Sequence, residues 1–502
     1  MGCSFVGGWY WGLAVLDVQN GAATATSAPE TAGRETARAR AEESRPGVPV
    51  RPYALLAGAL GVLYFLYSWV QYERFRTPSW DLGIFEQSVR AYSELRAPIV
   101  DIKGPGFLIL GDHFSPVTAL LAPLYWIWSS PLALLLAQAA LFAASAAVVG
   151  RTAQQVLGSR AAGLGLAVAY GLSWGLQEAV KSDFHEIAFA VPMLALTCRA
   201  LLLGRWTAAV AWSAPLVLVK EDMGLTVAMV GAVLFLRGGR RLGAALAAFG
   251  VAAFALTVLV LIPAASRVGQ YDYWAKIEKS SAGTDVPFTE VLLTSLGAGE
   301  KWEMLFFLVG ITGFLALRSP LMLLVLPTLG WRFLSQDPNH WGMLWHYSAI
   351  LMPVVFLALV DAVRAVRTSP RGWLVSYGKV VVPVVTAVSI VLALDLPLRD
   401  LLRPETYRTD TRTLEARKAV DAVPEGASVE TNVTLMAHLT ADHTVYWVGG
   451  AKGVTPDYLA FDLASGWSQP VADPVQLAAS LHPEARYEVS FQAGHFVVLR
   501  RA

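Results

Sequence analysis

Long apolar runs recur along most of this chain, and they constrain its fold more than any other feature. Runs close to the roughly twenty residues that a helix needs to cross a bilayer fill much of the sequence between residues 53 and 394. Only 15% of the 502 residues are charged, against about 25% in soluble proteins, and 55% are hydrophobic. The sequence therefore predicts an all-α polytopic membrane protein.

We expect about eleven crossings, because each apolar run is long enough, or nearly long enough, to span the hydrocarbon core. The expected spans are residues 53–72, 131–150, 161–178, 187–203, 206–219, 223–236, 242–263, 302–317, 320–335, 347–363 and 374–394. Every second linker carries arginine, and the positive-inside rule assigns those linkers to the cytoplasm. The arginines are Arg151, Arg160, Arg205, Arg237, Arg240, Arg241, Arg318, Arg364, Arg367 and Arg371. The predicted location is the cell membrane, with a cytoplasmic N-terminus.

Two segments decide which loops share a side. As a single helix, residues 206–236 would be roughly 46 Å long, against about 30 Å of hydrocarbon. We therefore expect two short spans that meet at Lys220, Glu221 and Asp222 on the outer side. Residues 116–128 are also apolar, and we expect a re-entrant or interfacial helix there, because a crossing would move the arginines that follow it outside.

The two ends of the chain differ from the membrane domain, which we place at residues 51–394 with a large first outer loop at 73–130. Residues 1–50 are predicted to be a disordered tail or a wrongly assigned N-terminus. Residues 395–502 are predicted to form a small extracytoplasmic α/β domain. Its expected elements are helices at 410–422 and 473–481, the latter capped by Asp473, and strands at 428–433, 444–449, 457–463, 487–492 and 495–501, the last two joined by a turn at Ala493 and Gly494.

Charge and cysteine content narrow the possible functions. A net charge of +1 gives no electrostatic basis for binding nucleic acid, so none is expected as a partner. Cys3 lies near the N-terminus and Cys198 lies in an apolar span, so no disulfide is expected between them. Membrane lipids are the predicted surroundings of the chain.

Asp81, soon after the first span, is the leading catalytic candidate, with Glu86 as a second. A carboxylate in a partly apolar loop near the bilayer surface should have a raised pKa and could act as a general base. The alternative is structural: Asp81 is the N-cap of a helix, and Glu86 is a solvated residue just over one turn later. The sequence leaves both interpretations open.

Lys103 belongs to a second polar group that also contains Asp101 and the Gly104-Pro105-Gly106 sequence that follows it. Glycines next to a lysine allow the backbone and the ammonium group to approach an anion, and phosphate is the obvious one. The spacing is not that of a phosphate-loop motif, so a plain Gly-Pro turn is the alternative.

The other acids and histidines of the membrane half fall mostly on the predicted outer side. Those that we assign to substrate are Asp112, His113, Lys220, Glu221, Asp222, His340 and His346. Asp183, His185 and Glu186 are candidate ligands for a divalent cation such as Mg²⁺ or Mn²⁺. No pair has a diagnostic spacing, and each group alone could be interfacial charge or a helix cap. Their common side favours one shared site.

Three runs of sequence carry a family resemblance: FRTPSWDLGIFEQSV, IKGPGFLILGDHFSPVTALLAPLYWIW and AYGLSWGLQEAVKSDFHEIAFAVPMLAL. They resemble a family of predicted bacterial membrane proteins of unknown function, from about residue 53 to the end of the chain. That family is distantly similar to the GT-C superfamily of membrane glycosyltransferases, which take sugars from polyprenyl-phosphate carriers. The resemblance implies a GT-C-like fold, a polyprenyl-phosphate sugar donor and a glycan, lipid or protein acceptor.

Asp81 matches the acidic residue that follows the first span in GT-C enzymes, where it deprotonates or orients the acceptor hydroxyl. The paired acid that is usual in that superfamily is absent, since Leu82 follows Asp81. A glycosyltransferase is the leading hypothesis, with Asp81 as base and Lys103 holding the carrier phosphate. A non-catalytic assembly or sensing protein is the alternative. A transporter is less favoured, because the charges lie on one side and the sequence has no convincing internal repeat.

Overall fold

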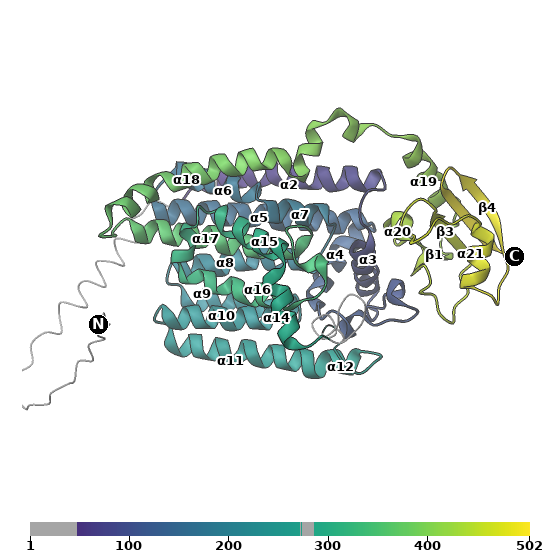
Figure 1. The fold of residues 1–502 in the computed structure, drawn as a ribbon, viewed down its shortest axis with the longest axis horizontal. Coiled ribbons are helices and arrows are strands. Elements are labelled where there is room, and N and C mark those ends of the chain that lie inside the picture. Colours follow the sequence, from purple (N-terminus) through teal and green to yellow (C-terminus); the bar gives the residue numbers. More distant parts are fainter. Residues whose placement is uncertain (1–47, 272, 274–285) are drawn as a thin grey trace, which may run out of the picture. The chain divides into compact units, whose positions relative to one another are not determined.

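The computed structural model describes residues 48–271, 273 and 286–502 (Figure 1). The predicted N-terminal tail, residues 1–50, therefore falls almost wholly outside the described residues. Everything below belongs to the compact unit Pro49–Ala502.

Among the described residues, five helical segments are long and apolar enough to cross a membrane. Two of them are single helices, α2 (Arg51–Glu73) and α5 (Pro131–Leu157). The segment Arg240–Ala265 consists of α11 (Arg240–Leu256), a π-helical turn and α12 (Ile262–Ala265). The segment His346–Val366 is a 3₁₀ turn followed by α17 (Leu351–Val366), and Gly372–Asp395 is α18 (Gly372–Leu392) followed by a 3₁₀ turn. The other predicted spans fall on shorter helices: α6 Arg160–Gly171, α7 Trp174–Lys181, α8 Ala190–Leu202, α9 Trp206–Ser213, α10 Met223–Leu236, α15 Gly299–Gly310 and α16 Leu326–Leu334; a further short helix, α14, spans Phe288–Gly297. The prediction of many apolar helices is confirmed, while the count of eleven crossings stays a prediction.

Both segments that decided the predicted topology behave as expected in their local structure. Helix α9 continues as a 3₁₀ helix that ends at Leu218, and α10 begins at Met223, so the 206–236 run is broken at the Lys220–Asp222 sequence. Residues 116–127 form only a 3₁₀ helix, Pro116–Leu121, and the short helix α4, Ala122–Ile127. At about 1.5 Å per residue α4 is far too short to span a bilayer.

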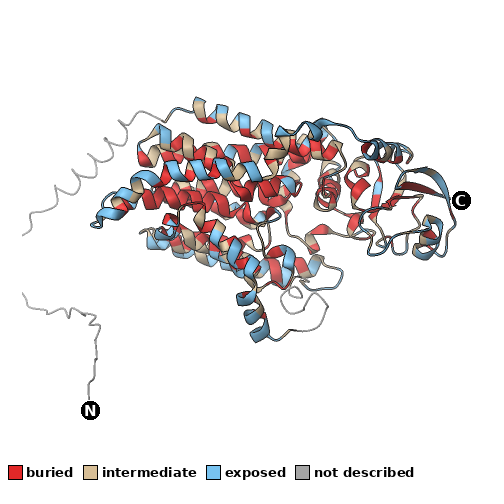
Figure 2. Cartoon of the chain, turned by 45° about the horizontal axis from the view of Figure 1, so that its top comes forward, coloured by how far each residue is buried: buried red, intermediate tan, exposed pale blue. Residues whose placement is uncertain are grey.

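Burial separates the central helix from the peripheral ones. In α17 the most apolar window is 89% buried, whereas in the α11 and α18 segments the figures are 28% and 22% (Figure 2). A helix that is apolar all round and also buried all round belongs in the middle of a bundle. Apolar side chains on the open faces of α11 and α18 are then suited to contact lipid.

Glycines permit a close contact between helices α10 and α11. A Cβ at Gly231 would lie 2.4 Å from the backbone of Ala247, and one at Gly250 would lie 2.5 Å from the backbone of Ala228. Only glycine permits this separation, which is a common device for packing helices within membranes.

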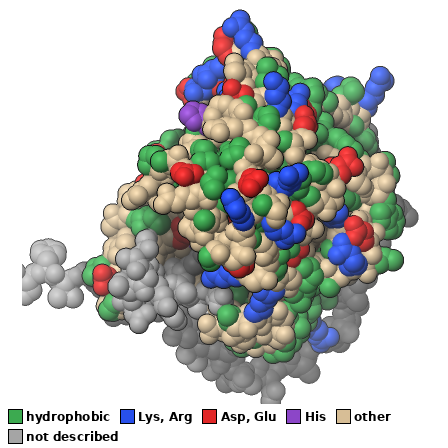
Figure 3. Space-filling view, turned by 90° about the vertical axis from the view of Figure 1, so that its right-hand side faces the viewer, with side chains coloured by type: hydrophobic (Ala, Val, Ile, Leu, Met, Phe, Trp, Pro, Cys, Tyr) green, Lys and Arg blue, Asp and Glu red, His purple; other side chains and the backbone are tan. Residues whose placement is uncertain are grey.

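The C-terminal sheet has the order β2-β1-β3-β5-β4. Its strands are β1 Ser428–Thr431, β2 Thr444–Trp447, β3 Tyr458–Asp462, β4 Tyr487–Ala493 and β5 Phe496–Arg501, and its helices are α19 Thr411–Asp421, α20 Val433–Leu439 and α21 Pro474–Leu481. β1 is parallel to β2 and β3, and β5 is antiparallel to β3 and β4. Acidic and basic side chains are interspersed over this end of the molecule (Figure 3).

All five predicted strands are confirmed, and Asp473 caps α21 by accepting hydrogen bonds from two backbone N–H groups. Gly494 has a φ of 53° between β4 and β5, as the predicted hairpin turn requires. One element was missed: Val433, predicted to end a strand, begins α20. The two faces of the sheet carry separate apolar clusters, one with α19 and α20 and the other with α21.

Candidate functional site

Helix α3, Trp80–Ser93, positions Asp81 in its first turn. The N-cap is Ser79, which has a φ of 66°, so the interpretation of Asp81 as the N-cap is wrong. The Asp81 side chain is 41% exposed, and its carboxylate faces the loop that follows α7. An acid on the first turn also interacts favourably with the partial positive charge of the helix N-terminus.

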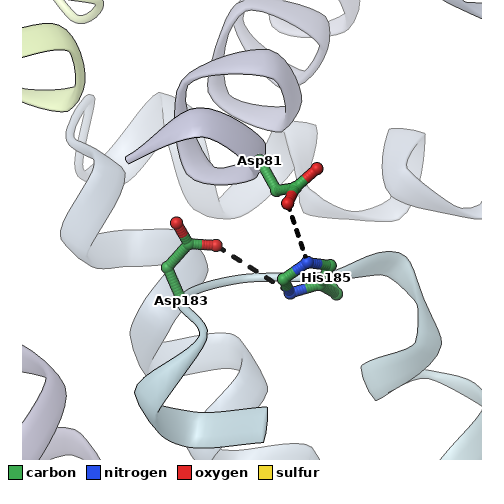
Figure 4. A group of neighbouring side chains, drawn as sticks. All are labelled: Asp81, Asp183 and His185. Carbon is green, nitrogen blue, oxygen red and sulfur yellow. Dashed lines mark ion pairs between the residues drawn. The ribbon is translucent and has the colours of Figure 1, made fainter. Parts of the chain in front are cut away.

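His185 is buried in that loop and lies between two carboxylates (Figure 4). Its Nε2 is 3.1 Å from Oδ2 of Asp81, and its Nδ1 is 3.8 Å from Oδ1 of Asp183. Gln138, a buried amide on α5, fixes the loop: it donates to the carbonyl of Asp183 and accepts from the backbone N–H of His185. Asp183 has a φ of 68°, an uncommon conformation outside glycine that often accompanies functional sites.

The charges of this trio are set by one another. Burial acts to raise the pKa of Asp81, but the positive charges of His185, His113 and Lys220 together outweigh it and hold that pKa below its ordinary value. Burial acts to lower the pKa of His185, yet the facing carboxylates raise it overall. Burial raises the pKa of Asp183 well above its ordinary value. The expectation of a raised pKa for Asp81 is therefore wrong, because the sequence could not show the imidazole beside it.

Several buried polar atoms of the site have no hydrogen-bond partner among the described residues. They include Oδ1 of Asp183, Nδ1 of His185 and Nδ1 of His346, whereas Nε2 of His185 faces Asp81. The rings of His185 and His346 are stacked, with centroids 3.4 Å apart. Asp81, Asp183 and His185 each offer one ligand atom, and these atoms lie within 4.8 Å of one another. Carboxylate and imidazole donors at this spacing could hold a divalent cation.

Ion pairs connect most of the other predicted residues to the same region. They are Lys103 Nζ–Asp112 Oδ2 at 2.9 Å, His113 Nδ1–Glu221 Oε1 at 3.4 Å and Lys220 Nζ–Glu186 Oε1 at 3.4 Å. Asp222 is the N-cap residue of α10, next in sequence to Glu221. The structure thus brings together loops that the sequence could only assign to a common side. Glu186 faces Lys220, so the predicted cation-binding trio of Asp183, His185 and Glu186 is replaced by one of Asp81, Asp183 and His185.

Two tyrosines of this region were missed by the sequence analysis. The Tyr273 hydroxyl lies 2.5 Å from Nε2 of His113, and the Tyr271 hydroxyl donates to Oε1 of Glu221 at 3.4 Å. Their rings are stacked, with centroids 5.5 Å apart. Their only sequence signal is an i, i+2 pair of aromatics in a polar loop, which is equally typical of an interfacial belt.

Two of the predicted residues lie apart from the cluster. Glu86 is fully buried and accepts a hydrogen bond from the Tyr125 hydroxyl, so the description of it as a solvated residue is wrong. Burial raises its pKa to about 7. His340 is held by the hydroxyl of Ser335, and its ring meets the edge of Tyr347, the neighbour of His346.

Apolar helices, a polar cluster at their ends and a small C-terminal sheet define a membrane protein with a polar site beside its helix bundle. The chain belongs to the family described as "Predicted membrane protein (DUF2079)", which matches residues 71–498. No protein among the curated sequences matches it.

One similar solved structure is that of ArnT from Cupriavidus metallidurans bound to undecaprenyl phosphate. The two chains share 13% sequence identity, and the match covers 89% of this chain and 97% of that one, with a TM-score of 0.52. ArnT is a GT-C glycosyltransferase, so the fold of this chain is GT-C-like. At this identity the likeness is one of fold alone.

Proposed function

We propose that this protein is a membrane glycosyltransferase that moves a sugar from a polyprenyl-phosphate carrier to an acceptor on the outer face of the cell membrane. The observation that carries the proposal is the pairing of a half-exposed Asp81 with a buried His185 in a GT-C-like fold. ArnT, which shares that fold, was solved with undecaprenyl phosphate, and this supports a polyprenyl-phosphate partner here.

In this mechanism Asp81 is the general base and His185 orients it. The carboxylate takes the proton of an acceptor hydroxyl, whose oxygen attacks the anomeric carbon of the donor sugar. The bond from that carbon to the phosphate oxygen breaks, and the electron pair leaves with the polyprenyl phosphate. The lowered pKa of Asp81 keeps its carboxylate ionised at neutral pH, so that it can accept a hydrogen bond from the acceptor hydroxyl and take the proton as the new bond forms.

Lys103 is the group that we assign to the carrier phosphate. Its side chain is 25% exposed, and it precedes a turn in which Gly104 and Gly106 both have positive φ. Arg267 donates to the carbonyl of Pro105 and adds a second cation to the same turn. Two cations beside a small-residue turn suit the charge that develops on a leaving phosphate.

A divalent cation fits the residues of the trio. Oδ1 of Asp183 and Nδ1 of His185 are buried and have no hydrogen-bond partner within the described part of the chain. A bound cation would satisfy both atoms. Asp81, Asp183 and His185 are the residues that would hold it, each through one atom, with His185 as the neutral imidazole and the second oxygen of Asp81 left for the proton. When bound, such an ion would supply Lewis-acid neutralisation of phosphate charge.

The proposal also includes a topology and a division into domains. The N-terminus is cytoplasmic, residues 51–394 form the membrane domain, and residues 395–502 form an extracytoplasmic domain beside the site. Reporter fusions at Arg240 and after Asp395 test it: the first should report cytoplasm and the second the outside. The reverse pattern contradicts the proposal, because it would put the site on the cytoplasmic face.

The decisive experiment compares the glycans and glycolipids of a strain that lacks the protein with those of complemented strains. Wild type should restore a glycoform that deletion removes, and Asp81→Asn at equal abundance should not. Glu94→Gln is the matched control. Like Asp81→Asn it replaces an acid at one end of α3 by its amide, but Glu94 lies at the opposite end, where it is exposed and paired with Arg96. The control should complement fully.

Two outcomes would overturn the proposal. Full complementation by Asp81→Asn removes Asp81 from the chemistry and leaves it a structural role. An unchanged glycan and glycolipid profile after deletion rejects the transferase, and favours an assembly, sensing or transport protein.

A further inference from the structure

Helix α3, which carries Asp81, is held by the C-terminal α/β region as well as by the membrane helices. Gly83 marks the closest approach. A Cβ at Gly83 would lie 2.9 Å from Cδ1 of Ile102 and 3.2 Å from Cγ of Met436 on α20. Both neighbours are fully buried, so one turn of α3 lies in a tight apolar contact in which a methyl group at Gly83 would force the side chains of Ile102 and Met436 to shift.

Polar contacts continue this attachment along α3. Gln87 donates to the carbonyl of Val445 on β2 at 3.0 Å and accepts from the backbone N–H of Ile102 at 3.2 Å. One turn later, Arg90 donates to the carbonyls of Thr440 and His443. A buried amide with donor and acceptor both used fixes the helix rotation more strictly than apolar packing alone.

The segment that leads into α3 is held by the same region. The ring of His438 on α20 stacks between Tyr72 and Phe75, with centroids 4.0 Å and 3.8 Å away. Next to Asp81, the ring of Trp80 meets the edge of Trp447 at the end of β2, with centroids 4.8 Å apart. Residues on both sides of Asp81 in the sequence therefore contact the C-terminal region: Phe75 and Trp80 before it and Gly83 after it.

Within the described part of the chain, only one face of the C-terminal sheet takes part in the contact with α3 and the loop 73–130. The apolar cluster on the α20 face includes Ile84, Ile102 and Ile109 of the loop 73–130. The cluster on the α21 face, which includes Leu459, contains no residue from outside the C-terminal region. The two faces give a matched pair of sites for a test.

We propose that α20 and β2 clamp α3 and thereby set Asp81 against His185, which makes Met436, Gln87 and Arg90 positioning residues for Asp81. The mechanical part of this inference stands without the proposed function. The consequence for catalysis rests on it.

Hydrogen–deuterium exchange of the purified full-length protein tests the mechanical part. Met436→Ala should speed amide exchange in Trp80–Ser93 by about tenfold or more, because it opens the contact with Gly83. Leu459→Ala, a similar truncation on the opposite face, should speed exchange in β3 and β5 and leave α3 as in wild type. Equal effects of both variants on α3, or no effect of either, would overturn the clamp.

The same variants test the consequence for catalysis. At equal abundance, Met436→Ala should lower the glycan product by about tenfold or more, Met436→Leu should restore it, and Leu459→Ala should leave it near wild type. A loosened α3 with normal product would overturn the positioning role while the transferase stands. A loosened α3 in a protein whose deletion changes no glycan leaves the clamp intact and rejects the proposed function.

A second variant guards against misfolding of Met436→Ala. Gln87→Leu keeps the size of the side chain and removes both of its hydrogen bonds, to Val445 and to Ile102. It should raise exchange at Trp80–Ser93 and at Ile102, and lower the product in the same direction as Met436→Ala. Wild-type exchange at α3 in this variant would also overturn the clamp.

Discussion

Helix α17 connects two buried ionic clusters that differ in how well their polar atoms are satisfied. His346, just before its first turn, stacks on His185 in the candidate site. Asp361 lies roughly 22 Å further along, at 1.5 Å per residue. There both carboxylate oxygens of Asp361 have partners, from Arg237, from Ser319 at 2.7 Å and from Arg364 at 2.8 Å, and the buried atom left without a partner among the described residues is Nε of Arg237.

The comparison separates a structural use of buried charge from a functional one. Removing one member of a satisfied cluster leaves a buried charge unpaired, so such a cluster ties elements together. The Asp361 cluster joins α17 to the loop before α11 and to the turn at Ser319. Around His185, by contrast, buried nitrogens and oxygens are left without partners, which costs stability unless a ligand completes them.

The largest expected effect is on catalysis at the unsatisfied cluster. Asp81→Asn should lower the transfer rate by about 10²–10⁴-fold, the usual contribution of a general base, and lower the free energy of unfolding by only about 1 kcal/mol, because its ion pair with His185 is half exposed. The rate is measured as product formed per folded molecule, and stability by denaturant unfolding of the purified protein. A large loss of stability with a normal rate would place Asp81 in the structural class beside Asp361.

The next effect is on stability at the satisfied cluster. Asp361→Ala should lower the free energy of unfolding by about 3–5 kcal/mol, because Arg237 is left without its buried carboxylate. The transfer rate per folded molecule should not change. Asp395→Ala is the control: its ion pair with Arg399 is exposed, so about 0–1 kcal/mol is expected.

Sequence patterns predicted the elements of the fold better than they predicted the site. Alternating apolar residues predicted the five strands, and a run too long for one span predicted the break at Lys220–Asp222. These features are local, because each depends on the periodicity or length of one segment. Helix α20 was missed because its sequence continues the β-favouring pattern of β1.

The site depends on contacts between segments far apart in the chain, and local patterns cannot show those. The sequence named Asp81 and His185 but gave no sign that they meet, so the direction of the pKa shift of Asp81 was wrong. Gln138 was missed because one amide in an apolar span is equally typical of helix packing. Assigning residues to one side of the membrane reduced the number of candidate site residues, but it did not show which of them lie in contact with one another.

Glu86 provides an intermediate case, a buried carboxyl outside both clusters. Burial raises its pKa from 4.5 to about 7, so the folded state holds the proton more tightly than the unfolded state does. The contribution of this proton to the free energy of unfolding is fully present below pH 4.5 and is lost as the pH rises from 4.5 through 7. The free energy of unfolding should fall by roughly 3 kcal/mol over that range. Glu86→Gln should remove this dependence and be more stable than wild type at pH 8. Parallel stability curves from pH 5 to 8 would contradict a buried neutral Glu86.

The smallest expected effect is on cation binding. It tests whether a metal ion binds the polar atoms of the site that have no hydrogen-bond partner among the described residues. Wild-type protein should bind Mn²⁺, and Asp183→Asn should weaken that binding by about 10–100-fold, since it removes one of three ligand groups. Titration followed by electron paramagnetic resonance measures the bound fraction. Asp361→Asn is the matched control, because its carboxylate oxygens already have partners and it should bind Mn²⁺ as wild type does.

Equal weakening of Mn²⁺ binding in both variants would mean that the ion responds to overall charge. No binding of Mn²⁺ to wild type would leave His185 as a partner of Asp81 alone. In that case the two clusters along α17 would differ in a simpler way. The carboxylate of Asp361 holds helices together, and the imidazole of His185 holds the Asp81 carboxylate by sharing a proton with it.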